Sequence, residues 1–355
     1  EIGICVVIIA VVLDKLSLAW ANKQKNYFAN LNFYQKNKSL LIFLILTLIC
    51  GIIAYFSSFY FIQGFNYLYI IPFDKGLTIS PYLDAFIDWI WETFFYYLNA
   101  FNVFLLTSVL GPMKQSYLNM PVVSTLFLVT GAGFIIGGIR SALVVFSLIL
   151  FIALSEYWDR ALITLYMATF AVGVSAFFGI VVGTLCAQRD FSTRSILSIC
   201  DFFQTFPSFI YLIPVILLFG ITDTSVMIAA IVYASVPATR YTVEGLKSVP
   251  ISLHDAGSMS GVSKFQRWTN IELPLAFPHI MLGINQTVIF ALFMIVLGAL
   301  IGTEDLGQII MGCLSRPNGA GIGLTLGIFI SFICLAVDNL IRTWADERKK
   351  MLGIE

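Results

Sequence analysis

Long apolar stretches separated by short polar ones recur along almost the whole chain. They follow one another at roughly the twenty-residue spacing that an α-helix needs to cross a bilayer. Nine such stretches are predicted as spans, at residues 2–18, 40–62, 122–137, 141–154, 161–186, 202–219, 225–241, 277–301 and 321–341. The pattern therefore predicts an all-α polytopic membrane protein with about nine transmembrane helices.

One aromatic-rich stretch, Leu83–Leu110, differs from these spans. Its apolar residues recur at helical spacing around Trp89 and Phe94, while Asp88 and Glu92 fall between them. This pattern is typical of a helix that lies in the membrane interface. A tilted transmembrane helix is the alternative.

A polar island lies between the last spans, from Ser252 to Pro274. Ser252 can cap a helix N-terminus, and Asp255, three residues on, can accept from backbone N–H groups and favour the positive end of the helix dipole. We expect a short helix from about Leu253.

The island also contains a stop signal and a second start. Gly261 can take the left-handed conformation that ends a helix, and Ser263 can cap a following one. Because the ring of Pro274 opposes helix continuation, this second helix is expected to stop before it. The island is thus predicted to be a compact helix-turn-helix.

Composition supports a membrane protein and excludes several other classes. The chain has 355 residues, of which 59% are hydrophobic and 11% charged, whereas soluble domains average about 25% charged. The twenty basic and twenty acidic residues cancel, so the chain has no net positive charge that would attract nucleic acid. Six cysteines without a CxxC pair and two separated histidines argue against disulfides and a metal centre.

Catalytic chemistry is missing from the sequence. It has no Gly-x-x-x-x-Gly-Lys-Ser/Thr loop for nucleotide phosphates and no nucleophile and base pair with an oxyanion site. We expect a protein that is not an enzyme, binds no cofactor itself and draws its energy from a partner.

Charged residues divide between the two sides of the membrane when the chain is followed through alternate spans. Basic residues gather on one side, in the linker 22–39, at Arg140, Arg189, Arg194, Lys247, Lys264 and Arg267, and in the tail 342–350. Acidic residues gather on the other, at Asp74, Asp84, Asp88, Glu92, Glu156, Asp159, Asp223, Glu304 and Asp305. The positive-inside rule makes the first side cytoplasmic. The polar island and the C-terminus are then predicted to be cytoplasmic.

The spacing across the polar island resembles the cytoplasmic Glu-Ala-Ala loop in the membrane subunits of binding-protein-dependent ABC importers. The residues that carry the resemblance are Asp255, Ala256, Gly257, Gly261, Ile271, Leu273 and Pro274. Asp replaces Glu, and Gly replaces the second Ala. The resemblance implies the ABC importer permease fold and a coupling loop that docks on an ATPase subunit. An ordinary amphipathic loop helix is the alternative.

Two membrane stretches, with the segment 301–307, resemble the glycine betaine, proline and choline branch of these importers. One contains Gln204, Thr205, Phe206, Pro207, Tyr211 and Pro214, and the other is 283–287 with Asn285, Gln286 and Thr287. The resemblance covers about residue 118 to the C-terminus, and residues 26–117 match only loosely. It implies a permease subunit for glycine betaine, choline, proline betaine or trimethylamine N-oxide.

The resemblance also implies partners and a location. These are two ATPase subunits that bind ATP and Mg, a periplasmic solute-binding protein, a second permease module as a homodimer or a tandem fusion, and the lipid of a bacterial inner membrane. A permease for another solute, such as an amino acid or a sulfonate, an ion-coupled secondary carrier and a non-transporting scaffold remain alternatives.

Polar residues inside the spans are candidates for the solute pathway. Amides such as Gln204, Asn285 and Gln286 are costly in a membrane unless they face a cavity or a partner. They line a pathway or hydrogen-bond neighbouring helices. Pro207 permits a kink that a gate could use. Aromatic faces hold a methylated ammonium well, so Phe206 and Tyr211 are candidates, with packing as the alternative.

The two ends of the chain resemble each other. Gly3, Ile4, Ile9, Asp14, Leu16, Trp20, Ala21 and Lys25 recur in register as Gly327, Ile328, Ile333, Asp338, Leu340, Trp344, Ala345 and Lys349. Chance similarity of two apolar helices is the alternative. We expect residues 1–25 to be the end of a preceding permease module, 26–117 a linker with one span and the interfacial helix, 118–345 the core permease and 346–355 a tail.

Overall fold

A computed structural model describes residues 2–21, 38–59 and 79–353, and every regular element in these ranges is a helix. This confirms the all-α prediction. The chain divides into two compact units, residues 1–85 and 86–355. In the first unit, α1 (Ile2–Ala21) and α3 (Lys38–Phe59) are apolar helices of 20 and 22 residues. Most of the basic linker predicted at 22–39 lies outside the described residues.

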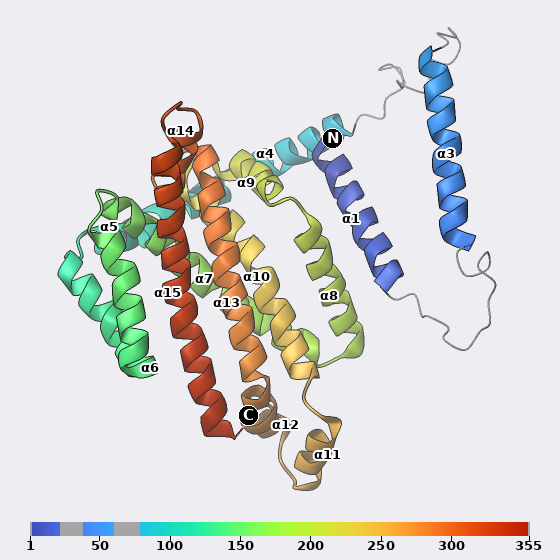
Figure 1. The fold of residues 1–355 in the computed structure, drawn as a ribbon. Coiled ribbons are helices and arrows are strands. Elements are labelled where there is room, and N and C mark those ends of the chain that lie inside the picture. The colour runs from blue at the N-terminus through green and yellow to red at the C-terminus, as the bar shows by residue number, and fades with distance from the viewer. Residues whose placement is uncertain (1, 22–37, 60–78, 354–355) are drawn as a thin grey trace. The chain divides into compact units, whose positions relative to one another are not determined.

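The second unit is a bundle of long helices with short connections at both ends (Figure 1). Its elements are the C-terminal part of α4 (Ser80–Phe104), η3 (Leu105–Leu110), α5 (Gly111–Leu118), α6 (Val122–Ala153), α7 (Trp158–Ala187), α8 (Asp190–Thr205), η4 (Ser208–Tyr211), α9 (Leu212–Phe219), α10 (Asp223–Lys247), α11 (Ile251–Met259), α12 (Lys264–Arg267), η5 (Trp268–Glu272), α13 (Leu273–Gly298), η6 (Ala299–Ile301), α14 (Leu306–Leu314) and α15 (Ala320–Leu352).

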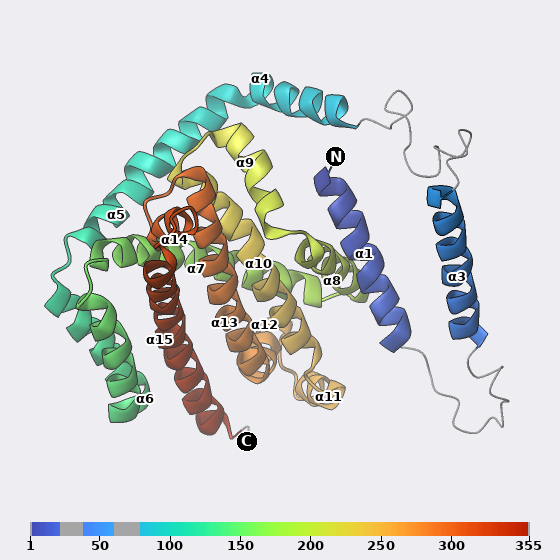
Figure 2. The same cartoon turned by 45° about the horizontal axis from the view of Figure 1, so that its top comes forward.

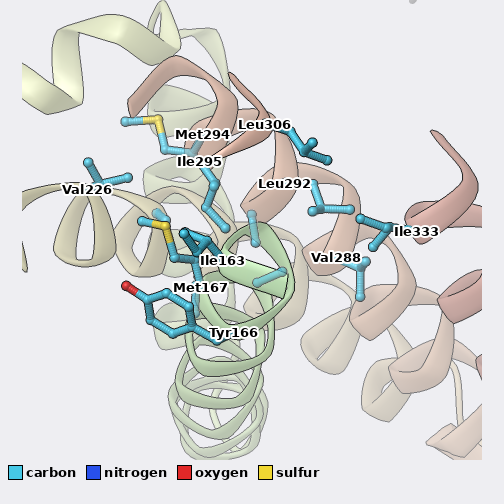
Figure 3. Packing of buried hydrophobic residues seen from close by; sticks show 14 of the residues in the cluster. Ile163, Tyr166, Met167, Val226, Val288, Leu292, Met294, Ile295, Leu306 and Ile333 are labelled. Carbon is cyan, nitrogen blue, oxygen red and sulfur yellow. The ribbon is translucent and has the colours of Figure 1, made fainter. Parts of the chain in front are cut away.

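The core of this unit lies among α7, α10, α13 and α15, whose apolar side chains meet in one cluster (Figure 3). Small residues bring the backbones close together, as expected for helices packed within a membrane. A Cβ atom placed on Gly179 of α7 would lie 2.4 Å from the Cβ of Ala238 on α10. Any residue with a side chain in place of Gly179 would push α7 and α10 apart.

The helix α6 reverses direction in its middle. Gly137 and Gly138 leave the helical conformation, and Gly138 has a φ of 65°. Gly133 consequently packs against the backbone of Ala142, although nine residues of straight helix would separate them by about 13 Å. The predicted separate spans 122–137 and 141–154 are thus the two arms of a helical hairpin.

The predicted span 202–219 is not one straight helix. The helix α8 begins at Asp190, ends at Thr205 and meets the η4–α9 segment at an angle of 105°. Phe206 and Pro207 are extended at the break, with ψ values of 128° and 126°. Proline restricts the residue before it to this extended conformation. The kink predicted from Pro207 is confirmed.

Six described helices are long and apolar enough to cross a membrane, and the bent pair α8 and α9 gives a seventh. The predicted number of nine is therefore approximate. The difference arises in part because α6 counts once although it turns back on itself, and because α1 and α3 adjoin residues that are not described.

The aromatic stretch predicted at the interface forms one helix from α4 through the π-helical turn η3 to α5, and its length also satisfies the criterion for a span. Its residues 86–118 run across the end of the bundle that carries α9 and α14 (Figure 2). The Asn102 amide donates to the Phe219 carbonyl at 3.1 Å, at the end of α9. The interfacial position stays a prediction.

Candidate functional site

The bundle has two ends of different character. The loop end, as we call it, carries α11, α12 and the C-terminal end of α15 (Figure 1). Lys247 and Asp190 form an ion pair of 2.7 Å there, and the turn of the α6 hairpin at Gly137 packs on Thr343. Basic residues of the second unit that the sequence assigns to one side of the membrane, such as Lys247, Lys264 and Arg267, are therefore brought to one end of the bundle.

The first loop helix, α11, begins two residues earlier than its capping residues predict. Its N-cap is Pro250, with no side-chain cap, and Ile251 is its first residue. The prediction that Ser252 caps this helix is wrong, because Ser252 already lies inside the first turn. Asp255 lies in the second turn and is exposed. Among the described residues no backbone N–H donates to its carboxylate, so it does not help to cap α11.

The end of α11 follows the predicted chemistry. Gly261 has a φ of 73°. Its N–H donates to the Ser258 carbonyl at 3.2 Å, and the N–H of Val262 donates to the Gly257 carbonyl at 3.2 Å. These two bonds are the Schellman arrangement, which satisfies carbonyls that a helix end would otherwise leave unpaired. The predicted stop at Gly261 is confirmed.

The second loop helix starts at the predicted cap and continues further than predicted. Ser263 accepts from the Gln266 N–H at 3.3 Å, and the Gln266 side chain accepts from the Ser263 N–H at 3.0 Å. The cap is confirmed. The expected stop before Pro274 is wrong: helical structure continues through η5, and the proline lies in the first turn of α13. A first-turn N–H has no partner within its own helix, so proline is tolerated there.

One carboxylate joins the two halves of the loop. Glu272 accepts from Arg267 Nε at 2.9 Å and lies 3.1 Å from His254 Nδ1, and Arg267 also donates to Ser258 Oγ at 3.2 Å. The sequence places His254, Arg267 and Glu272 within the loop, but the contacts among them were not predicted. Arg267 and Glu272 are five positions apart, a spacing that brings side chains together in a π-helical turn but not in an α-helix.

Close packing explains one departure from the Glu-Ala-Ala pattern. A Cβ atom on Gly257 would lie 3.1 Å from Cδ1 of Ile271. Gly257 is buried, so even an alanine would need Ile271 to shift. Leu273 and Pro274 are half-buried at the start of α13. The loop residues singled out from the sequence therefore lie in one small structure of two packed helices.

The loop helices leave apolar side chains uncovered. Ile251, Met259 and Phe265 are 76%, 90% and 71% exposed, and Ala256 is exposed beside Asp255. Exposed apolar groups on a rigid, hydrogen-bonded support are typical of a surface that contacts another protein.

Gln204 and Asn285, two of the three amides predicted to line a pathway, have hydrogen-bond partners within the bundle. Gln204 Oε1 accepts from Arg240 Nη1 at 2.8 Å, and Arg240 also bonds Asp201 at 2.7 Å and Glu244 at 3.0 Å. This is the helix-to-helix hydrogen bond that the sequence left as the alternative. The Thr205 hydroxyl donates to the Phe202 carbonyl at 2.8 Å.

The second set of polar residues, on α13, faces other partners. The Asn285 side chain donates to Asp338 of α15, while its own oxygen is buried with no partner among the described atoms. Thr287 is buried and donates to the Gly283 carbonyl at 2.9 Å. Gln286 is partly exposed. The amides of α8 and α13 thus do not join into one site.

Aromatic residues from three parts of the chain meet beside the break after α8. The Phe206 and Tyr211 rings are 5.9 Å apart, Tyr211 and Tyr233 are 5.4 Å apart, and Tyr233 stacks on Phe290 at 4.9 Å. The Tyr211 hydroxyl donates to the Phe203 carbonyl. The structure brings the two predicted aromatic residues together. Tyr233 and Phe290 were missed because no spacing in the sequence links them to Tyr211.

The opposite end, as we call it, carries an ion network drawn from distant segments. Lys114 Nζ lies 3.3 Å from Glu304 and 3.7 Å from Asp223. The Tyr166 hydroxyl donates to Asp223 at 2.9 Å. These contacts tie α5, α7 and α10 to the loop before α14.

Asp305, in that loop, is fully buried. One of its oxygens accepts from the Gln308 N–H at 3.2 Å and from Thr303 at 3.2 Å, and the other has no partner among the described atoms. Burial away from water raises the pKa of the Asp305 carboxyl to about 7.

No group of three or more His, Cys, Asp or Glu residues in the described part of the chain is arranged to hold a metal ion.

Comparison with known proteins identifies the relatives of the chain. Residues 179–349 match the family of binding-protein-dependent transport system inner membrane components. The chain is 59% identical over 354 residues to the trimethylamine N-oxide transport system permease protein of Pelagibacter ubique, covering 100% of this chain and 49% of the relative.

Two further relatives are also transport system permease proteins. The trimethylamine N-oxide transport system permease protein of Ruegeria pomeroyi is 35% identical over 364 residues, covering 100% of this chain and 53% of the relative. The glycine betaine transport system permease protein of Bacillus subtilis is 29% identical over 275 residues, 77% of this chain and 96% of the relative. The chain spans about half the length of the two trimethylamine N-oxide permeases.

Proposed function

We propose that this chain, whose residues 179–349 match the family of binding-protein-dependent transport system inner membrane components, is the membrane-spanning part of an ATP-driven importer for small methylated ammonium osmolytes. The relatives named for trimethylamine N-oxide and glycine betaine support this solute class. Glycine betaine, choline and proline betaine are the other members of the class to be tested.

The observation that carries the proposal is the loop of α11 and α12. Its turn is closed by Gly261, its halves are joined by Glu272, and it presents exposed apolar residues at one end of the bundle. A rigid element of this kind can transmit motion, because α12 continues through η5 into α13 without a non-helical break, and His254 of α11 is held to Glu272 of η5. We assign this loop to contact with an ATPase subunit.

The energy for transport is assigned to partners. The sequence contains no loop for nucleotide phosphates, so ATP and Mg belong on two ATPase subunits. A periplasmic solute-binding protein would deliver the solute, and a second permease module would complete the pathway. The loop end then faces the cytoplasm of a bacterial cell with this chain in its inner membrane, which agrees with the gathering of basic residues there.

The aromatic cluster at the break after α8 is the proposed contact for the solute. A quaternary ammonium cannot donate hydrogen bonds through its methyl groups, and an aromatic face attracts a cation within about 6 Å of the ring centre. Phe206, Tyr211, Tyr233 and Phe290 come from both sides of a 105° bend and from two other helices. A change in this bend would move the rings relative to one another, as alternating access requires.

The proposal is tested by reconstituting the membrane protein in proteoliposomes with its ATPase and solute-binding protein. We expect ATP-dependent uptake of labelled trimethylamine N-oxide or glycine betaine, with competition by other methylated ammonium compounds. Competition only by methionine or a sulfonate would assign another solute class. Uptake that survives removal of the ATPase would indicate a secondary carrier, and the absence of all flux would indicate a scaffold.

The role of the rings is tested separately. Tyr211→Ala and Tyr233→Ala are expected to lower uptake by roughly tenfold or more at low solute concentration, since a desolvated cation–π contact contributes about 2 kcal/mol. Tyr96→Ala is the matched control, because this tyrosine is 78% exposed and lies in α4. Equal uptake by the cluster variants and the control would contradict the assignment.

A further inference from the structure

The helix α1 repeats part of the sequence of α15, and the two faces of α15 are repeated unequally. Identical residues in register include Ile9 and Ile333, Asp14 and Asp338, and the Trp-Ala pairs at 20–21 and 344–345. Both segments are helical. Equal spacing therefore places the matching residues at equivalent register positions.

Residues of α15 that contact α13 are largely repeated in α1. Asp338 accepts from the Asn285 amide of α13. The Trp344 ring lies 5.3 Å from Phe277, in an edge-on arrangement. Ala345 is 7% exposed and belongs to the cluster that contains Ala276 and Ile280 of α13. Asp14, Trp20 and Ala21 hold the equivalent positions in α1.

Residues of α15 that contact α6 are not repeated. Asn339 accepts from the Ser141 hydroxyl at 2.5 Å, and its equivalent is Lys15. Thr343 packs at Gly137, and its equivalent is Ala19. Phe329 and Phe332 meet Phe151 edge-on, and their equivalents are Cys5 and Ile8.

The match on the α13-facing side has one exception. Ile341 packs in the cluster with α13, and its equivalent is Ser17. Shared Ile and Leu would be expected of any two apolar helices. An aspartate inside an apolar helix is costly without a partner, so its recurrence together with Trp-Ala on one face indicates a common packing requirement.

In this chain α15 already occupies the α13 surface, through Asp338, Trp344 and Ala345. We infer that α1 is an α15-type helix that packs against an α13-type helix of a second, non-identical permease module. That helix is expected to offer a hydrogen-bond donor to Asp14 and an aromatic ring to Trp20. Lys15 and Ala19 differ from Asn339 and Thr343, the residues of α15 that contact α6. We therefore expect the helix that takes the place of α6 beside α1 to differ from α6 in sequence at these contacts. The inference deepens the proposed function and rests on it for the permease character of the partner.

Site-specific photo-cross-linking in the intact transporter tests the partner. A benzophenone amino acid replaces Ser17, which is equivalent to Ile341 on the α13-facing side. The control position is Val11, equivalent to Leu335, which is 50% exposed on α15. We expect the label at 17 to join a peptide outside residues 38–355 whose sequence resembles α13, and the label at 11 to join lipid.

Two results would overturn the inference. One is a cross-link from position 17 to residues 264–301 of this sequence, from the same molecule or another copy, or to lipid alone. The other is equal protein labelling from positions 11 and 17. Neither result depends on the solute, so failure to transport methylated ammonium compounds would leave the cross-link unchanged.

A matched pair of substitutions gives a second readout. Asp14→Ala is expected to reduce the yield of assembled transporter roughly five- to thirtyfold, because intramembrane polar contacts of this kind contribute about 1–2 kcal/mol. Lys15→Ala, at the α6-type position, is expected to leave the yield within about twofold, since no equivalent contact is repeated there. Equal yields from the two variants would contradict the assignment of faces.

Discussion

The ion network within the α11–α12 loop and the ion network at the opposite end of the bundle have similar chemistry and different origins. At the loop end, Glu272 bonds Arg267 and His254, all within nineteen positions of one another. At the opposite end, Lys114 bonds Asp223 and Glu304, which lie 109 and 190 positions away. The first network holds one short segment in shape, whereas the second holds separate helices together.

The two ends are therefore expected to respond differently to amino-acid substitutions. The loop is stabilised by its own turn, cap and ion pairs, so a substitution there is expected to alter the loop while the bundle stays folded. The opposite end is stabilised by contacts between α5, α7, α10 and the loop before α14. A substitution there is expected to alter the stability of the bundle.

The largest expected effect is that of Gly261→Pro in the loop. Gly261 has a φ of 73° and donates its N–H to Ser258. Proline holds φ near −65° and has no N–H, so the turn is expected to lose more than about 3 kcal/mol. ATP-driven uptake should be abolished while the protein remains inserted and the bundle folded, as measured by uptake and by thermal unfolding in detergent.

The control for this prediction is Gly261→Asn, because asparagine tolerates the left-handed conformation. It should keep most of the uptake. Normal uptake by the proline variant would show that the shape of this turn is not needed for coupling. Unfolding of the whole bundle in the proline variant would show that the loop is not independent of the bundle, and that the two ends do not differ in this respect.

Asp305 at the opposite end predicts a pH dependence of stability. Burial raises its pKa to about 7 in the folded protein, whereas an unfolded aspartate titrates near about 4. Between these values the folded state holds the proton more tightly, so this group makes stability fall as pH rises from about 4 to about 7 and level off above. The total fall is on the order of a few kcal/mol.

The variant Asp305→Asn tests this dependence, since it keeps a side-chain oxygen that can accept from the Gln308 N–H and carries no charge. The free energy of unfolding in detergent should lose its decline between pH 5 and 7. Asp84→Asn is the control, because Asp84 is exposed in α4. An unchanged pH profile for Asp305→Asn would contradict the prediction.

Tyr166→Phe removes one long-range hydrogen bond from the same end. Its hydroxyl donates to Asp223, and the residue is fully buried. Loss of a hydrogen bond to a charged group is expected to reduce the free energy of unfolding by about 2 kcal/mol. Tyr117→Phe, whose ring lies 6.4 Å away, is the control and should change stability much less. Equal effects of the two substitutions would show that the bond to Asp223 contributes little.

The smallest expected effect separates the two serines of the loop. Ser263 caps α12, so Ser263→Ala is expected to destabilise the loop by about 1 kcal/mol. Ser252 caps nothing, so Ser252→Ala should have almost no effect. Hydrogen exchange of the loop amides measures both. Faster amide exchange in Ser252→Ala than in Ser263→Ala would show that Ser252 does cap α11.

Local features of the candidate site could be predicted from the sequence, and contacts between helices could not. The stop at Gly261 and the cap at Ser263 depend on backbone conformation and on a partner three residues away. The continuation past Pro274 was missed because it depends on the π-helical turn η5, and this turn brings Arg267 and Glu272 together. The pairing of Gln204 with Arg240 was missed because it joins α8 to α10.

The sequence by itself determined that this is an all-α membrane protein and where most of its helices lie. These properties follow from hydrophobicity and from interactions between near neighbours, which act in any fold. Only the tertiary structure decided that Tyr233 meets both Tyr211 and Phe290, and which face of α15 contacts α13. These contacts join residues far apart in the chain, and their partners are chosen by the packing of whole helices.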